Sequence, residues 1–286
     1  MPSPLADIFR RAAELNRRDD RREGNVVRLE GGCEVIASGD LHGHGENLTR
    51  LIAFADLGSA EQRRLVLQEI IHGPPDPRTG RDRSVEQLLR VARLKVAHPR
   101  QVLLLLGNHD VAQAMGSEIT KAGRGVCEDF VRGVEHACGD GRAAEALEAI
   151  NDFLLSAPLA IRTPGKVMML HSLPSPGRMR WAGEQISADP YEPADLRRGG
   201  WVYEWTWGRK QTLEQIDLLA RRLDVGLFVL GHRRITSRFE IISPKAIILT
   251  AEHDRGCVMH FPSAAAINAR TAPDYLKPLA ALGAGP

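Results

Sequence analysis

Five short apolar runs of this chain each end on side chains that can bind a metal ion or transfer a proton. The first run, Cys33 to Ser38, is followed by Gly39-Asp40-Leu41-His42-Gly43-His44. The polar residues at the five ends are Asp40 and His42, Glu69 and His72, Asn108 with His109 and Asp110, His171, and His232. In open α/β sheets, ligands bind beyond the carboxyl ends of the strands. The pattern therefore predicts an α/β fold whose strand ends form one site.

Helical patterns alternate with these apolar runs. Glu46 to Leu57 and Ser84 to Ala97 predict helices, while Arg64 to Ile71 and Val102 to Leu106 predict buried strands. The intervening segment His72 to Gly80 contains three prolines, which remove backbone donors and fix φ, so we expect an irregular loop there. The order is strand, loop and helix, repeated.

We see no internal repeat and no clear linker, so the chain is expected to have one main domain. It comprises residues 33–263, after an N-terminal helix and connector over residues 1–32. The last stretch, residues 264–286, ends in Gly-Ala-Gly-Pro and is expected to be a frayed tail.

Composition excludes several classes of function. The chain has 286 residues, 43% of them hydrophobic, which is enough for a sizeable core. A net charge of +2, with 26% charged residues of both signs, gives no electrostatic argument for a nucleic-acid or membrane partner. The four cysteines form no CxxC pair, and no apolar run approaches the roughly 18 residues of a membrane span. We therefore expect a cytoplasmic protein.

The residue types at the strand ends favour a particular chemistry. Carboxylates, imidazoles and one neutral amide suit divalent ions such as Mn, Fe or Zn. Two such ions roughly 3.5 to 4 Å apart can clamp the attacking and leaving oxygens at phosphorus and lower the pKa of a bridging water. The strand ends therefore predict a two-metal site that hydrolyses a phosphate ester or anhydride.

The order of the motifs resembles that of a known superfamily. Gly39-Asp40-Leu41-His42-Gly43, Gly107-Asn108-His109-Asp110, Leu170-His171 and Gly231-His232 are similar to the signature of the calcineurin-like metallophosphoesterases, over roughly Val35 to Phe261. The resemblance implies a four-layer α/β/β/α sandwich of two mixed sheets. It also implies that Asp40 and His42 hold the first metal, that Asn108, His171 and His232 hold the second, and that His109 protonates the leaving oxygen.

One position points to a branch of this superfamily. Many members carry Gly-His-x-His at the last motif, where the second His is a further ligand, but this chain has Arg234 there. In this respect it resembles the phosphoprotein phosphatases, which include Ser/Thr protein phosphatases and symmetrical dinucleoside-tetraphosphate hydrolases. The implied partner is a phosphorylated substrate, either a protein or a small molecule.

The second motif departs from that branch. The branch has Gly-Asp-x-x-Asp-Arg-Gly, and the best match here is Gln68-Glu69-Ile70-Ile71-His72-Gly73. Glu69 would then bridge the metals, and His72 would replace the carboxylate that orients the acid. A shifted alignment would instead choose Asp76 as the bridge. Gly73 would stand where the phosphate-binding arginine stands.

Other residues could restore the missing phosphate contact. Arginine binds phosphate through two parallel N–H groups, and the candidates are Arg78, Arg81 and Arg83 in the long loop and Arg209 later in the chain. All four tryptophans lie between Trp181 and Trp207, a segment that also contains Arg198. We expect this segment, with Trp205, to form a wall of the substrate pocket, although tryptophans could equally pin the segment to the sheet.

Two classes of function follow. The first is a dinuclear metal-dependent phosphoesterase. The second is a metal-binding regulatory or scaffold protein with weakened catalysis, an alternative that the altered segment Glu69 to Gly73 motivates. A dinucleoside polyphosphate hydrolase is a variant of the first class.

Overall fold

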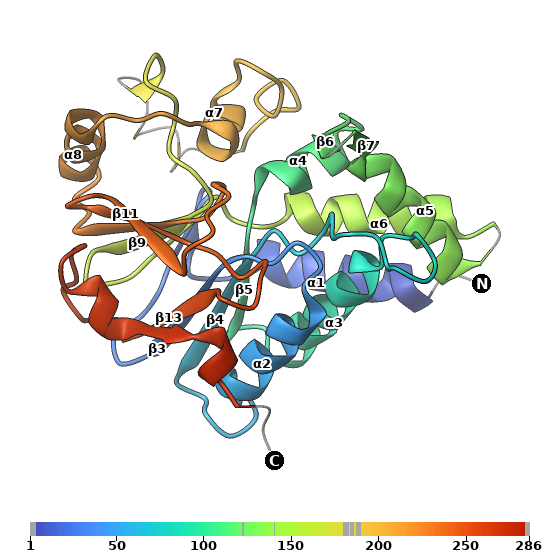
Figure 1. The fold of residues 1–286 in the computed structure, drawn as a ribbon, viewed down its shortest axis with the longest axis horizontal. Coiled ribbons are helices and arrows are strands. Elements are labelled where there is room, and N and C mark those ends of the chain that lie inside the picture. The colour runs from blue at the N-terminus through green and yellow to red at the C-terminus, as the bar shows by residue number, and fades with distance from the viewer. Residues whose placement is uncertain are drawn as a thin grey trace.

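Two mixed β-sheets lie at the centre of the fold (Figure 1). The computed structural model describes residues 4–121, 123–139, 141–179, 183, 186 and 190–283. Within these residues, one sheet has seven strands in the order β1-β2-β8-β9-β10-β12-β11, and the other has five in the order β14-β13-β3-β4-β5. Strands β6 and β7 form a separate two-stranded hairpin.

The elements have the following bounds. The seven-stranded sheet contains β1 Arg22–Glu23, β2 Val26–Arg28, β8 Ala160–Arg162, β9 Val167–Leu170, β10 Leu227–Leu230, β12 Ala246–Leu249 and β11 Phe239–Ser243. The five-stranded sheet contains β14 Leu276–Pro278, β13 Cys257–Pro262, β3 Glu34–Asp40, β4 Arg63–Gln68 and β5 Val102–Leu105. The hairpin is β6 Thr120–Lys121 and β7 Arg124–Gly125. The helices are α1 Pro4–Arg17, α2 Gly45–Ala55, α3 Ser84–Ala97, α4 Asn108–Ala114, α5 Val126–Cys138, α6 Ala143–Leu155, α7 Trp201–Trp207 and α8 Leu213–Arg222, with short 3-10 helices η3 Ala272–Tyr275 and η4 Leu279–Ala281.

Neighbouring residues of the central strands belong to different hydrophobic clusters. In β4, Val66 lies in one cluster and Leu65 and Leu67 in another; in β10, Val229 and Phe228 divide in the same way. Because successive strand residues point to opposite faces, the cluster with Val66 and Val229 fills the space between the two sheets. The outer faces are covered by helices, with α2 and α3 against the smaller sheet and α8 against the larger. This confirms the four-layer α/β/β/α architecture.

The strands that carry the predicted site end at one edge of the sandwich. Strands β3, β4 and β5 run parallel to one another, and β9 runs parallel to β10 in the other sheet. A single parallel bridge between Asp40 and Thr250 connects the two sheets among the residues described. The predicted site therefore lies where the two sheets meet.

The first and last segments of the described residues belong to this fold. Strands β1 and β2 join the larger sheet, so the predicted connector is part of the domain. The expectation of a frayed tail was wrong for residues 264–283, because β14 pairs with β13 and Ala272 and Leu279 are fully buried. Residues 284–286 lie outside the described part. No helix in the described part is long and apolar enough to cross a membrane.

Candidate metal centre

Asp40, the last residue of β3, contributes a buried carboxylate. Its Oδ2 accepts a hydrogen bond of 2.7 Å from the backbone N–H of His232. Its Oδ1 is buried, has no hydrogen-bond partner among the described residues, and lies 3.5 Å from Nδ1 of His171. A buried anionic oxygen without a hydrogen bond is costly unless a cation compensates it. Asp40 Oδ1 is thus suited to bind a metal ion.

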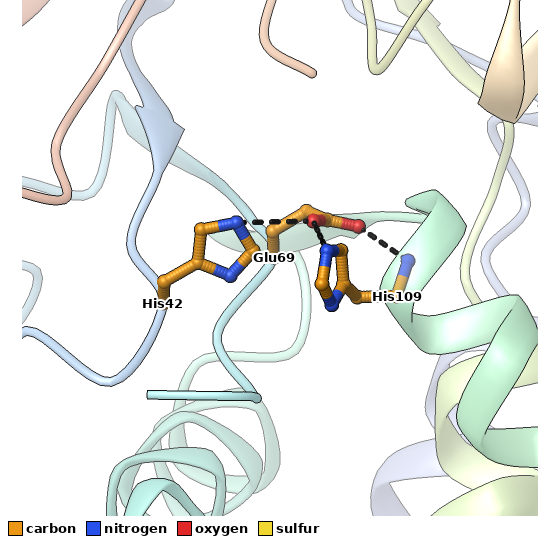
Figure 2. A group of neighbouring side chains, drawn as sticks. All are labelled: His42, Glu69 and His109. Atoms are coloured by element: carbon orange, nitrogen blue, oxygen red, sulfur yellow. Dashed lines mark hydrogen bonds and ion pairs between the residues drawn. The ribbon is translucent and has the colours of Figure 1, made fainter. Parts of the chain in front are cut away.

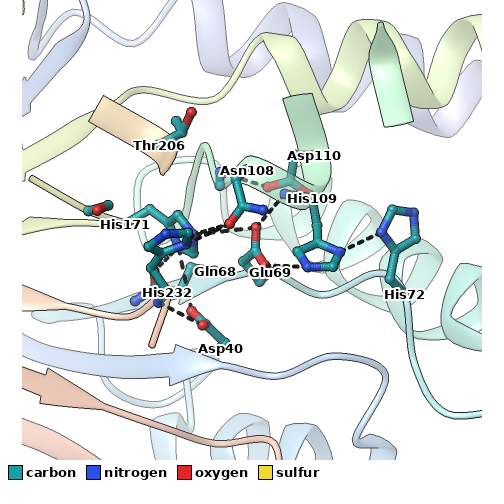
Figure 3. Close-up of polar contacts among 12 residues, drawn as sticks. Asp40, Gln68, Glu69, His72, Asn108, His109, Asp110, His171, Thr206 and His232 are labelled. Carbon is teal, nitrogen blue, oxygen red and sulfur yellow. Dashed lines mark hydrogen bonds and ion pairs between the residues drawn. The ribbon is translucent and has the colours of Figure 1, made fainter. Parts of the chain in front are cut away.

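His171, His232 and Asn108 converge on the same point (Figure 3). Asn108 Oδ1 lies 2.9 Å from His171 Nε2 and 2.7 Å from His232 Nδ1, and these two ring nitrogens are 3.1 Å apart. Gln68 Oε1 lies 3.0 Å from the other ring nitrogen of His171, Nδ1. Because that oxygen can only accept, His171 carries its proton on Nδ1 and offers the lone pair of Nε2 to the site.

Glu69 follows β4 and lies between two groups of ligand atoms. One group is His42, Glu69 and His109, the other is Asp40, Glu69 and His171, and within each group the ligand atoms lie within 4.8 Å of one another. Oε2 is 3.5 Å from His42 Nε2 (Figure 2). Oε1 is 3.6 Å from His171 Nε2. We call the set with His42 the His42 group and the set with His171 the His171 group. Asp40 thus lies with His171 rather than with His42.

The alternative bridge, Asp76, faces its own loop. Its Oδ1 accepts hydrogen bonds from the backbone N–H groups of Arg78 and Thr79, at 2.9 and 3.0 Å. Only Glu69 of the two belongs to the groups of ligand atoms. The position of Asp76 in its own loop therefore favours Glu69 as the residue that would bridge two metal ions.

Four of the predicted site residues have left-handed backbone conformations. The φ angles are 41° at His42, 46° at Glu69, 63° at His72 and 67° at His232. Such angles are uncommon for residues other than glycine, and they cluster at functional sites. They lie in the segments that follow β3, β4 and β10, where the chain turns at the site.

Two glycines let the carboxylates approach the backbone. A Cβ atom at Gly231 would lie 2.1 Å from Asp40 Oδ1, and one at Gly107 would lie 2.1 Å from Glu69 Oε1. Asp110 Oδ2 accepts a hydrogen bond of 2.9 Å from the N–H of Gly107 and so fixes the turn into α4. Burial raises the pKa of Asp110 to about 7. The glycines of the motifs therefore have a steric role.

His109 is oriented by a chain of hydrogen bonds. Its Nδ1 is 2.7 Å from His72 Nδ1, and His72 Nε2 is 2.9 Å from Gln113 Oε1. The Gln113 oxygen accepts, so His72 donates from Nε2 and accepts through Nδ1 from the N–H of His109. The Nε2 atom of His109 then faces Glu69, 3.9 Å from Oε2. Gln113 was not predicted, although its place one helical turn after His109 could have indicated it.

Lys121 of the β6–β7 hairpin also reaches the site, and no motif indicated it. Its Nζ lies 3.2 Å from His42 Nε2. Burial and the charge of Lys121 lower the pKa of His42 to about 4, so this imidazole is neutral at pH 7. Burial, followed by the charge of Asp40, raises the pKa of Glu69 well above its usual range. A bound cation would reverse the shift of Glu69, which fits a metal site.

The predicted substrate-binding residues have different positions. Arg209 Nε donates a hydrogen bond of 2.8 Å to His232 Nε2, so this arginine is at the site. Arg78 and Arg198 are exposed. Trp205 of α7 is 2% exposed and belongs to the hydrophobic core, which corrects the predicted pocket wall in favour of packing against the fold. Trp181 lies outside the described residues.

Comparison with known proteins supports the fold. No protein-family model matches the chain, and no curated protein does. A protein serine/threonine phosphatase from Saccharomyces cerevisiae is 15% identical, with a TM-score of 0.66 over 90% of this chain and 81% of that chain. A cold-active protein-tyrosine phosphatase of a psychrophilic Shewanella species is 16% identical, with a TM-score of 0.62 over 88% and 80% of the two chains. The chain therefore has the fold of these two phosphatases, in agreement with the fold that the order of its strand-end motifs predicts.

Proposed function

We propose that this protein is a phosphoesterase that uses two divalent metal ions, with Mn, Fe and Zn as the candidates. The observation that carries the proposal is the place of Glu69, whose carboxylate belongs to both groups of ligand atoms. Asp40, with one buried oxygen lacking a hydrogen bond, supports it. The proposed ligands are Asp40, His42, Glu69, Asn108, His171 and His232.

The ions would polarise a phosphoryl oxygen and provide a water-derived nucleophile at neutral pH. The chain's own residues would bind the phosphate and supply the proton. Arg209 and Lys121 each contact a proposed histidine ligand, at 2.8 and 3.2 Å, and could bind phosphate oxygens where Gly73 offers none. Two cations from distant segments would thereby replace the missing arginine.

His109 is the proposed general acid. Its Nδ1–H is donated to His72, so His109 would act as an imidazolium with a second proton on Nε2, and that second proton would move to the leaving oxygen. Burial lowers the pKa of His72 to about 3, which keeps this partner neutral. His72 would therefore orient His109 without the charge that a carboxylate would add.

A second candidate function follows from the same departure. With a neutral His72 beside the acid and Gly73 in place of the arginine, the protein would bind metals yet hydrolyse esters poorly and act as a regulatory module. The site would then be a binding site whose catalytic power is reduced. The two candidates differ in turnover rather than in metal binding.

The experiment measures metal binding and turnover separately. Metal-free protein is titrated with Mn²⁺, Fe²⁺ or Zn²⁺ by calorimetry, and hydrolysis of p-nitrophenyl phosphate is then measured. We expect His109→Ala to keep both metals and lose turnover, and Asn108→Ala to weaken metal binding and turnover together. Metal binding without turnover would favour the regulatory function, and absence of metal binding would overturn both.

A further inference from the structure

A basic cavity opens beside the candidate metal centre. Its volume is about 640 Å³, and its lining includes Arg209, Lys210, Arg233, Arg234, Glu240 and Ile241. Four cationic side chains thus face one carboxylate among the described lining residues, a surplus of three positive charges. The whole chain carries a net charge of only +2, so this concentration is local. A cavity of this charge favours an anionic occupant.

The cavity is continuous with the metal centre through two segments. Arg209 lines it and also donates a hydrogen bond of 2.8 Å from Nε to the proposed ligand His232. Arg233 and Arg234 directly follow that ligand in the chain, and both are exposed. A substrate whose phosphate lies at the metals would therefore have its next groups at the mouth of this cavity.

One of the four cations in the cavity lining is partly compensated, because Arg233 Nη2 lies 3.2 Å from Glu240 Oε1.

We infer that this cavity binds a second phosphoryl group of the same substrate molecule. The inference rests on the proposed function, since it extends the substrate of that site. A guanidinium group can bind two oxygens of one phosphate through two parallel N–H groups. A surplus of three positive charges also suits a phosphoryl dianion better than a single carboxylate. The apolar side chains of Ile241 and Ile242 also line the cavity and could contact a carbon linker between the two groups.

The test uses non-hydrolysable ligands, so that it does not depend on turnover. Binding of butane-1,4-bisphosphonate and of butylphosphonate to the Mn²⁺-loaded protein is measured by calorimetry. We expect the bisphosphonate to bind about tenfold more tightly or better, the effect of one added charge-assisted contact. In Lys210→Ala/Arg234→Ala and in Arg233→Ala/Arg234→Ala this preference should fall to about twofold, the statistical factor for two equivalent ends.

The control is Arg270→Ala, which removes an exposed arginine that is not part of the cavity lining and should keep the full preference. Circular dichroism checks that each variant is folded. Equal binding of the two phosphonates, or a preference that both double variants retain, would overturn the inference.

A second arm separates this occupant from a protein. Phosphoserine peptides with acidic or with alanine neighbours are compared as ligands. If Lys210 and Arg234 favour the acidic peptide but not the bisphosphonate, the cavity recognises a protein and the inference is wrong. Failure to hydrolyse p-nitrophenyl phosphate, with the bisphosphonate preference intact, would instead count against the proposed function alone.

Discussion

The two groups of ligand atoms share Glu69 but differ in the charge beside them. In the His171 group, Gln68 Oε1 lies 3.0 Å from Nδ1 of His171, and the N–H of His232 donates to Asp40. In the His42 group, Nδ1 of His42 lies 3.1 Å from the backbone oxygen of Ile71, and Lys121 from a separate hairpin lies 3.2 Å from its Nε2. Neighbouring groups therefore orient the histidines of both groups, but the His42 group also contains a cation that a metal ion must displace or tolerate.

The largest effect is expected where the two groups meet. Glu69→Gln keeps the shape of the side chain and removes its charge, so both metal sites should weaken. We expect kcat for p-nitrophenyl phosphate to fall about 100-fold or more, since mutating residues that only hydrogen-bond to metal ligands already lowers metal affinity or activity by about 10- to 100-fold. Calorimetry should show fewer than two bound Mn²⁺ ions.

Asp76→Asn is the matched control, because Asp76 is the other carboxylate of this segment and hydrogen-bonds to its own loop. It should keep both ions and near-normal turnover. Two ions bound by the Glu69 variant but not by the Asp76 variant would reverse the assignment of the bridge.

A smaller effect is expected when the His171 group alone is disturbed. Gly231→Ala would place a Cβ atom 2.1 Å from Asp40 Oδ1, so the carboxylate must move. We expect a loss of about 10- to 100-fold in kcat, as for other changes that misplace a ligand. Gly58→Ala, where no atom lies within 4 Å of the added Cβ, is the control. Equal activity of the two alanine variants would show that Asp40 is not held as tightly as described.

The His42 group is tested through Lys121. Lys121→Met removes the ammonium beside His42 while keeping much of the side-chain length. We expect tighter binding of one Mn²⁺ ion, because a competing positive charge is gone, and a rise of about tenfold in KM and in the inhibition constant of orthophosphate. Unchanged inhibition by orthophosphate would show that Lys121 does not bind phosphate.

Tighter binding of Mn²⁺ together with weaker binding of orthophosphate would distinguish a phosphate-binding lysine from one with only a structural role. A structural lysine would alter unfolding, not the balance between metal and phosphate affinity. Arg124→Met, on the other strand of the same hairpin, controls for loss of the hairpin itself.

The smallest effect concerns stability rather than turnover. The pKa of His72 is lowered by burial from 6.5 to about 3 in the folded protein. As the pH falls below about 6.5, the unfolded chain takes up a proton that the folded chain cannot, so this contribution is complete above that pH and is lost on acidification. The contribution of His72 to the free energy of unfolding of the metal-free protein should fall by up to about 1.4 kcal/mol per pH unit between pH 6.5 and 4.

Urea unfolding at pH 7.5, 6.0 and 5.0 measures this slope. His72→Gln should make it shallower, whereas His136→Gln, at an exposed position of α5, should leave it unchanged. An identical slope in wild type and the His72 variant would mean that His72 is protonated in the folded protein.

The polar residues at the ends of the central strands could be predicted from the sequence, because an apolar strand followed by polar residues forms a local pattern. Asp40, Glu69 and His171 were found this way, and the structure brings them together. Lys121 and Gln113 left no such pattern, since one acts from a two-residue strand and the other from the second turn of a helix. Their roles depend on contacts over 79 and 41 residues of chain.

The aromatic segment shows a different difficulty. Tryptophans gathered in one segment fit both a pocket wall and a packed helix, and only the burial of Trp205 separates the two. The tail was misjudged for a similar reason, because its small and apolar residues gave little sign of the edge strand β14. Packing against distant elements decided both cases.

The left-handed backbone at His42, Glu69, His72 and His232 has a consequence for stability. Glycine would adopt the observed φ at each of these positions with no steric penalty, so the side chains present carry a conformational cost. We predict that Gly variants at these positions relieve this strain but lose activity.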